Sequence, residues 1–294
     1  MKKITIPTVV LLCFCLPILL SAQVAPSNHV IIVVEENHGY SQIIGNSNLP
    51  FLNSLASKYS LATQYYANVH PSIGNYFMLT TGQIITNDAG HVPIVTADNV
   101  VRRILTAGKT WKSYLESVPS VGYLGPDKFP YTRGHNPISY LSDVANSSVQ
   151  KLHLVPFTQF PKDLTNHALP NYSFIVPNQQ HNGHNCPPGT SPCSDSLILR
   201  TLDAWLKNNI GPLLSTAAFQ QDGILIIVFD EGKETDTAHG GGHTATVIVG
   251  PKVKKGFRSS QFDQHQNVLR TALDALGIHH YPGKSATAVD MNVF

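Results

Sequence analysis

The sequence carries little charge. Asp, Glu, Lys and Arg together make up 13% of its 294 residues, and Lys2 and Lys3 are the only charged residues among the first 22. Removing those two lysines from the 20 basic residues leaves 18, against 18 acidic ones. A chain with no net charge produces no overall electrostatic field that would attract nucleic acid or an anionic membrane surface. We therefore expect neither as a partner. Because 42% of the residues are apolar, the low charge does not indicate disorder.

A long hydrophobic run is also missing. The apolar stretch at residues 8–20 contains a proline and is too short to cross a bilayer. It follows a basic start and precedes small residues, which is the pattern of a secretory signal peptide cleaved before Gln23. We therefore predict a signal peptide at residues 1–22 and an exported domain at residues 23–294. The protein would be secreted or periplasmic, without a stable membrane anchor; an uncleaved N-terminal anchor is the alternative.

Cysteine is scarce as well. Two of the four cysteines lie in the predicted signal peptide, and Cys186 and Cys193 remain. Three prolines and a glycine stiffen the loop between them and bring its ends together. In an exported protein this pattern predicts a disulfide bond. Metal ligation is the alternative, but the pair lacks the two-residue spacing of a zinc knuckle.

The hydrophobic pattern alternates between strands and helices. Runs of apolar residues predict buried strands, and stretches with one apolar face, bounded by Pro or Gly, predict helices. The predicted strands are residues 29–34, 172–176, 224–229 and 246–249, and the predicted helices are residues 50–58, 72–81, 98–107, 197–206 and 268–276. This order predicts one α/β domain, with a mostly parallel central sheet and helices on both faces. Residues 117–195, where Pro, Gly and His are dense, are predicted to form a loop-rich, cap-like insertion.

Acidic residues directly follow two of the predicted strands. Glu35, Glu36 and Asn37 end the first strand, and Asp230 and Glu231 follow the strand at 224–229. Ligands of a parallel sheet bind at the carboxyl ends of its strands. Carboxylates placed there are costly to desolvate unless a cation compensates them, and their oxygen atoms suit a hard or borderline divalent cation. The alternative is that they cap helices or lie in solvent.

Ser72 is the candidate nucleophile. It begins the predicted helix at 72–81, where free backbone N–H groups favour an alkoxide or a phosphate. A serine at this position is usually only a helix cap, but a nearby metal ion would lower the pKa of its hydroxyl and make it nucleophilic. Farther along the chain, His135 and Arg133 together suit an anionic substrate, and the glycine run before His243 lets the backbone pass close to a ligand.

These motifs together resemble the phosphoesterase family of bacterial acid phosphatases and phospholipases C, within the alkaline phosphatase superfamily. The resemblance spans nearly the whole exported chain. Its motifs, in order, are Glu-Glu-Asn-His at 35–38, His-Pro-Ser-x-x-Asn-Tyr at 70–76, Thr-Thr-Gly at 80–82, His-Asn-Pro at 135–137, Pro-Asn at 177–178 with His184, Asp-Glu at 230–231, Gly-Pro at 250–251, and His265 before Leu-Arg-Thr at 269–271. Each fragment is weak alone, but the ordered set is specific.

The resemblance implies a fold like that of alkaline phosphatase and a role for each matching residue. The implied metal ligands are Glu36, Asn37, Asp230, Glu231 and Ser72. Ser72 would also be the nucleophile, and His135 and His184 would act on the substrate or its leaving group. We further expect the substrate to be bound by His70, Asn75, Arg133, His181 and His243. Amides and an extra histidine replace the family's usual acids at 178–185, so one divalent metal ion is expected: zinc, calcium, magnesium or manganese.

The expected function is hydrolysis of a small phosphate ester through a phosphoserine on Ser72. We favour an acid-phosphatase-like monoesterase, because phospholipases of the family are usually longer and the chain shows no aromatic amphipathic stretch for docking on lipid. A phospholipase C-type diesterase and an inactive binding protein on the same fold are the alternatives. Sulfatase chemistry would need a Cys/Ser-x-Pro-x-Arg context, which residues 72–76 lack.

Overall fold

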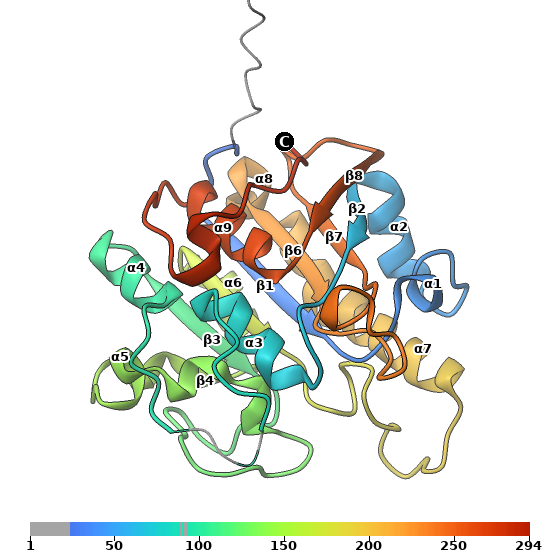
Figure 1. Ribbon diagram of the computed structural model, residues 1–294, viewed down its shortest axis with the longest axis horizontal. Helices are drawn as coiled ribbons and strands as arrows, with labels where there is room; N and C mark the ends of the chain where they lie inside the picture. Colours follow the sequence, from blue (N-terminus) through green and yellow to red (C-terminus); the bar gives the residue numbers. More distant parts are fainter. Residues whose placement is uncertain (1–23, 89, 91–92) are drawn as a thin grey trace, which may run out of the picture.

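The computed structural model describes residues 24–88, 90 and 93–294, and the predicted signal peptide lies outside these residues. Within them the chain forms one eight-stranded sheet in the order β4-β3-β5-β1-β6-β7-β2-β8 (Figure 1). The strands are β1 (Val30–Glu35), β2 (Ser60–Tyr65), β3 (Trp111–Leu115), β4 (Leu154–Pro156), β5 (Tyr172–Val176), β6 (Ile224–Phe229), β7 (Thr246–Val249) and β8 (Phe257–Asp263). β7 is antiparallel to both of its neighbours and every other pairing is parallel, which confirms the predicted mostly parallel sheet.

Helices cover both faces of the sheet. The α-helices are α1 (Tyr40–Ile43), α2 (Pro50–Lys58), α3 (Ser72–Thr81), α4 (Val100–Thr106), α5 (Ser142–Ala145), α6 (Gln159–Thr165), α7 (Asp195–Trp205), α8 (Ala217–Asp222) and α9 (His265–Ala275). One apolar cluster joins the sheet to α3, α4, α5 and α9, which lie in front of it in Figure 1. A second cluster joins the opposite face to α2, α6, α7 and α8.

Strand β1 shows why the two faces are equally buried. Its side chains alternate, so Val30, Ile32 and Val34 enter the first cluster while Ile31 and Val33 enter the second. Such a strand reads as a continuous apolar run, because neither side faces water. β1 lies between β5 and β6, deep inside the sheet. The residues that follow it are therefore held on a rigid support.

The sequence pattern missed the strands with mixed polarity. β8 is an edge strand with the sequence Phe-Arg-Ser-Ser-Gln-Phe-Asp, half of it exposed, and its partner β2 carries Thr63 and Gln64. β3 contains a lysine, and β4 has only three residues at the other edge. An edge strand can be stable with few apolar residues because its neighbour supplies the hydrogen bonds and half of its packing.

The segment predicted as a cap is only partly outside the sheet. Its residues 154–156 and 172–176 are β4 and β5, so the loop-rich parts are 117–153 and 177–194. The second part contains the disulfide bond between Cys186 and Cys193, whose Cα atoms lie 5.7 Å apart, as the spacing predicted. The domain boundaries drawn from the sequence stay a prediction.

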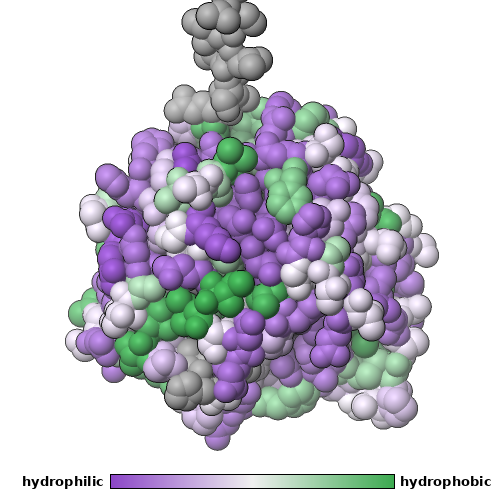
Figure 2. All heavy atoms as spheres, viewed as in Figure 1, coloured by the Kyte–Doolittle hydropathy of each residue, from purple (hydrophilic) through white to green (hydrophobic). Residues whose placement is uncertain are grey.

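The face in front of the sheet is mostly hydrophilic, with one hydrophobic band across its lower half (Figure 2). The large apolar side chains that are exposed include Phe129, Val149 and Val289. No helix in the part of the chain that the structure describes is both long and apolar enough to span a membrane.

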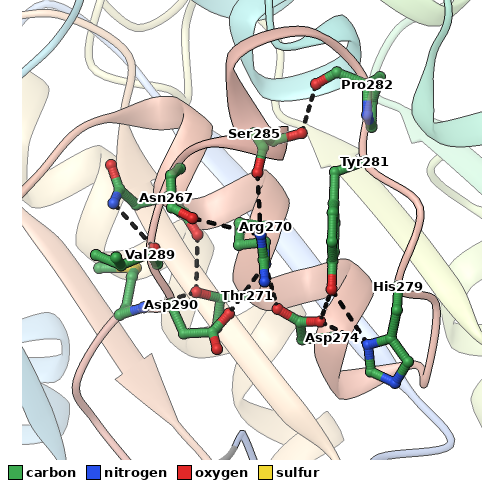
Figure 3. Close-up of polar contacts among 12 residues, drawn as sticks. Asn267, Arg270, Thr271, Asp274, His279, Tyr281, Pro282, Ser285, Val289 and Asp290 are labelled. Carbon is green, nitrogen blue, oxygen red and sulfur yellow. Dashed lines mark hydrogen bonds and ion pairs between the residues drawn. The ribbon is translucent and has the colours of Figure 1, made fainter. Parts of the chain in front are cut away.

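A polar cluster ties the C-terminal segment to α9 (Figure 3). Arg270 forms an ion pair with Asp274 and stacks on the ring of Tyr281, while His279 and Tyr281 both contact Asp274. Burial, and a hydrogen bond with Asp274, raise the pKa of Asp290 to about 7. Burial favours the neutral form of Asp274 too, but hydrogen bonds from its neighbours lower its pKa overall. Of these two carboxyl groups, Asp290 is therefore the one whose environment favours the protonated form.

We expect Asp290→Asn to change how thermal stability depends on pH. The folded protein holds the Asp290 proton more tightly than the unfolded chain, so its stabilising effect is complete only below the unfolded-state pKa of 3.8 and is lost as the pH rises to about 7. The asparagine amide keeps a donor at all pH values. Compared with the variant, the wild-type Tm should fall by about 2 °C or more between acidic and alkaline buffer. Two parallel Tm-against-pH curves would contradict this expectation.

Candidate active site

The acidic residues meet because β1 and β6 are neighbours. The two strands pair in parallel up to Glu35 and Phe229, and the backbone N–H of Asp230 donates to the carbonyl oxygen of Glu35. Glu36, Asn37 and Glu231 therefore leave the sheet at the same edge as Asp230. Asp230 Oδ1 accepts hydrogen bonds from the backbone N–H groups of Asn37 and Glu231, at 3.3 and 2.7 Å. These contacts lock the two strand ends together.

The Ser72 hydroxyl reaches the same cluster from α3. Its Oγ lies 2.9 Å from Glu231 Oε1, 3.4 Å from Glu36 Oε2 and 3.5 Å from Asn37 Oδ1. Asn75 holds the loop before the helix, since its Oδ1 accepts from the backbone N–H groups of Asn68 and Val69 while its Nδ2 donates to the Val69 carbonyl. The structure thus brings the five predicted metal ligands together.

A positive charge would stabilise the buried carboxylates of this cluster. Glu36 and Asp230 are fully buried, and Glu231 is 5% exposed. Burial, with the added charge of neighbouring carboxylates, raises the pKa of Glu36 and of Asp230 well above the usual values. Burial raises the pKa of Glu231 too, against the hydrogen bonds from Ser72 and His70. Asp230 Oδ2 has no hydrogen-bond partner among the described residues.

This donor set fits a divalent metal ion. Three carboxylates, an amide oxygen and a hydroxyl are oxygen ligands of the kind that hard cations take. In the part of the chain described, no three His, Cys, Asp or Glu side chains already form a metal-binding group. The fit therefore rests on the chemistry of the donors and on the unpartnered oxygen of Asp230, not on a finished coordination shell.

Three residues support the carboxylates. Tyr76 Oη donates to Glu36 Oε1 at 2.5 Å, and burial with the Glu36 charge raises the pKa of Tyr76, which keeps this hydroxyl protonated. His70 Nδ1 lies 2.8 Å from Glu231 Oε2, and its Nε2 lies 2.9 Å from the Asp236 carbonyl. His265 Nε2 lies 2.6 Å from the Asp230 carbonyl. No role for Tyr76 or His265 was predicted from the sequence, although both stand in the motifs.

The two predicted catalytic histidines lie on one side of this cluster. His135 stacks on Tyr76, with ring centroids 4.8 Å apart, and its Nδ1 is 3.3 Å from Glu36 Oε1. Burial, and then the charge of His184, lower the pKa of His135 to about 3. The His184 ring lies 6.4 Å from that of His135 and is exposed, with Nδ1 against Asn185 Oδ1.

The remaining predicted substrate residues contact other groups. His181 Nδ1 pairs with Glu116 at 2.9 Å, and Arg133 lies over the ring of Tyr140. His243 stacks between Tyr40 and Tyr66. The polar atoms of His70 and Asn75 already form hydrogen bonds, His70 with Glu231 and Asn75 with the loop before α3. Roles for these five residues in substrate binding stay predictions, and for His70 and Asn75 the contacts favour a positioning role instead.

Known proteins resemble this chain over most of its length. The model of the Phosphoesterase family matches residues 46–278. A phosphatidylinositol-3-phosphatase of Mycobacterium tuberculosis is 31% identical, over 85% of this chain and 77% of that protein. A probable acid phosphatase of Kluyveromyces lactis is 26% identical over 81% of this chain, and an acid phosphatase of Aspergillus fumigatus is 28% identical over 80%. The chain spans about half the length of these two fungal relatives, 55% and 51%.

Solved structures show the same fold at low sequence identity. A protein of the alkaline phosphatase superfamily from Vibrio parahaemolyticus superposes with a TM-score of 0.59 at 12% identity, over 86% of this chain and 67% of that one. The lipoteichoic acid synthase LtaP of Listeria monocytogenes also gives 0.59, at 11% identity, over 92% and 76%. The resemblance inferred from the motifs is confirmed. The chain belongs to the Phosphoesterase family, a family of phosphoric ester hydrolases, and has the fold of the alkaline phosphatase superfamily.

Proposed function

We propose that this protein is an exported, metal-dependent phosphomonoesterase that uses Ser72 as its nucleophile. The observation that carries the proposal is the Ser72 hydroxyl at the first turn of α3, 2.9 Å from Glu231 and surrounded by buried carboxylates. Burying several like charges around one hydroxyl costs desolvation free energy. A purely structural role could be filled by residues that cost less to bury. Its value lies in holding a cation next to a reacting oxygen.

One divalent metal ion would be held by Glu36, Asn37, Asp230, Glu231 and the Ser72 hydroxyl. When bound, it would neutralise the carboxylates, lower the pKa of the Ser72 hydroxyl and stabilise negative charge on the phosphoryl group. Tyr76 and His70 would hold Glu36 and Glu231 in place through the hydrogen bonds described above. Such supporting contacts orient ligands and tune their basicity.

In the first step, Ser72 Oγ attacks phosphorus in line with the ester oxygen. The new Oγ–P bond forms as the ester P–O bond breaks, and the Ser72 proton passes to the nearest carboxylate oxygen, Glu231 Oε1. The free N–H groups at the start of α3 stabilise the equatorial phosphoryl oxygens. The product of this step is a phosphoserine and an alcohol.

The departing alcohol oxygen needs a proton. His184 is our candidate donor because its ring is exposed beside His135, on the side from which an alcohol can leave. Positioned proton transfer of this kind contributes about a hundredfold or more to the rate. Water then attacks the phosphoserine, so that a new P–O bond forms as the Oγ–P bond breaks and phosphate is released. The proton held by Glu231 returns to Ser72 Oγ, and the proton given up by the water passes to His184, which restores both groups.

The relatives favour a monoester over a diester substrate. Those described above are named acid phosphatases and a phosphatidylinositol-3-phosphatase, so each name denotes removal of a phosphate group. The deciding assay compares purified protein on p-nitrophenyl phosphate and on phosphatidylcholine, with and without chelator. Turnover of phosphatidylcholine alone would establish a phospholipase C-type diesterase. Turnover of neither substrate with metal restored would favour a binding protein.

Export is part of the proposal. It rests on the leader pattern at residues 1–22, which lies outside the described residues, and on the Cys186–Cys193 disulfide, which is typical of oxidising compartments. N-terminal sequencing of the secreted or periplasmic fraction tests it. A chain beginning at Gln23 is the expected result.

We expect Tyr76→Phe to weaken metal binding by about tenfold, because Glu36 loses the donor that orients it. Calorimetric titration of metal-free protein with the preferred metal measures the effect. Tyr66→Phe is the matched control, since that hydroxyl donates to Gln64 instead. Equal metal affinity in the two variants would show that Tyr76 does not support the site.

A further inference from the structure

The first turn of α9 contacts two separate parts of the candidate active site. α9 begins at His265, which is fully buried, and the helix packs against α3, which begins at Ser72. The backbone N–H of His265 donates to Asn68 Oδ1, 3.3 Å away, in the loop before α3. The imidazole ring of His265 lies against the backbone of Asp230. One residue therefore contacts the loop that leads to the proposed nucleophile and the strand end that carries a proposed metal ligand.

Asp230 is held through its backbone as well as through its side chain. Its backbone N–H donates to the Glu35 carbonyl oxygen, and its own carbonyl oxygen lies 2.6 Å from His265 Nε2. Its Oδ1 accepts from the backbone N–H groups of Asn37 and Glu231, whereas its Oδ2 has no partner among the described residues. The backbone at Asp230 is therefore fixed on both sides of the side chain, and Oδ2 is the atom that can still bind a cation.

A tyrosine determines which nitrogen of the His265 ring carries the proton. Tyr65, on β2, is fully buried, and its Oη lies 2.7 Å from His265 Nδ1. Burial raises the pKa of the Tyr65 hydroxyl well above its usual value, so the hydroxyl stays protonated and can donate. Burial also lowers the pKa of His265 to about 4, so at neutral pH the ring carries a single N–H. Because Nδ1 accepts from Tyr65, that N–H is at Nε2 and points at the Asp230 carbonyl oxygen.

The other neutral tautomer would break the contact with Asp230. With the proton on Nδ1, the lone pair of His265 Nε2 would face the Asp230 carbonyl oxygen at 2.6 Å, and two acceptors at this distance repel each other. The carbonyl oxygen would also lose its donor in a place closed to water, which costs free energy. The Tyr65 hydroxyl therefore acts on the Asp230 backbone through the His265 ring.

We propose that Tyr65 and His265 are positioning residues that hold the Asp230 carboxyl group where it can bind the metal ion. The proposal rests on the proposed function, since it takes Asp230 as a metal ligand. Tyr65 fixes the tautomer and orientation of His265, and His265 fixes the backbone of Asp230. Hydrogen bonds that orient a metal ligand in this way typically contribute about tenfold to a hundredfold to metal affinity.

Two substitutions at His265 separate positioning from packing. The side-chain nitrogen of glutamine can reach the place of Nε2 and donate to Asp230, whereas an asparagine side chain reaches only the place of Nδ1. Calorimetric titration of metal-free protein with manganese chloride should show an affinity within about threefold of wild type for His265→Gln and a loss of about tenfold or more for His265→Asn. Both variants lack the buried ring, so their Tm values should fall by similar amounts. Equal manganese affinity in the two variants would overturn the proposal.

Tyr65→Phe tests the outer member of the pair. It should weaken manganese binding by about tenfold, because His265 Nδ1 loses its donor and the ring can adopt the other tautomer. Tyr172→Phe is the matched control. Tyr172, on β5, is also fully buried, but its hydroxyl has no hydrogen-bond partner in the described part of the chain. The same affinity in these two variants would show that Tyr65 has no positioning role.

The tautomer can be measured without metal or substrate, which separates this proposal from the proposed function. Long-range proton–nitrogen NMR spectra of isotope-labelled protein distinguish protonated from unprotonated ring nitrogens, and the signals that disappear in His265→Gln are those of His265. We expect the proton on Nε2 in the wild type. A proton on Nδ1 would overturn the proposal, even in a protein that hydrolyses p-nitrophenyl phosphate. A proton on Nε2 in a protein that neither binds manganese nor hydrolyses this ester would support the hydrogen-bonded pair and contradict the proposed function.

Discussion

Ser72→Ala should reduce kcat for p-nitrophenyl phosphate by at least about a thousandfold, because it removes the proposed nucleophile. Its methyl group fits the space of the hydroxyl, and the loop before α3 is still held by Asn75. The variant should therefore fold normally, with a Tm within about 3 °C of wild type. Steady-state rates and thermal unfolding, measured on the same preparation, check both parts.

Ser54→Ala is the matched control for this experiment. Ser54 lies on α2, and its hydroxyl donates to the Phe51 carbonyl. It should keep the full rate. Phosphate trapping adds a direct test, since acid quenching during turnover should leave phosphoserine at position 72. A Ser72→Ala protein that retains most of the wild-type rate would remove the serine mechanism.

Asp230→Asn should abolish tight metal binding and lower kcat/KM by at least about a hundredfold. Asp230 is fully buried, and its Oδ2 has no hydrogen-bond partner in the described structure. Loss of its charge weakens the attraction for a cation, while the amide can still accept from Asn37 and Glu231 through its oxygen. Elemental analysis after dialysis against chelator measures the metal, and activity after metal is added back measures the function.

The stability of the metal-free protein gives a second readout. Burial raises the pKa of Asp230, so its folded state binds a proton more tightly than the unfolded chain. The contribution of this carboxyl group to stability is therefore present at acidic pH and is lost as the pH rises and the group ionises. Metal-free Asp230→Asn should lose less stability than metal-free wild type over the same range. Asp195→Asn, an exposed residue in the first turn of α7, should behave like wild type in every assay, whereas full metal retention by Asp230→Asn would contradict the proposed ligand set.

Some features of this protein followed from local patterns in the chain. β1 and β6 are buried on both faces, so nearly every position is apolar and the strands can be identified without a structure. The start of α3 at Ser72 follows from the proline before it, and its end from Gly82 in the left-handed conformation. The acids after β1 and β6 stand out because they directly follow such strands, and the family motifs name the same residues.

Other features depend on contacts between distant parts of the chain. The strands β2 and β8 have mixed polarity by sequence, and pairing between distant segments stabilises them: β2 pairs with both β7 and β8, and β8 pairs with β2 at the sheet edge. Tyr76 reads as a core residue of α3, and only its hydroxyl against Glu36 shows its second role. Likewise, His181 and Glu116 form a pair across a sequence separation of 65 residues, which no local pattern predicts.

The sequence by itself determined which side chains are candidates for binding a cation and for the nucleophile, because residue type and strand-end position are local properties. The tertiary structure decided which of them meet. Adjacent parallel strands carry Asp230 to Glu36, and the loop held by Asn75 carries Ser72 to both. The same folding engaged His70 in a hydrogen bond with Glu231 and Asn75 in hydrogen bonds with the loop before α3. Hydrogen bonds between distant residues depend on the register and packing of the whole sheet, and that information is not present in any single motif.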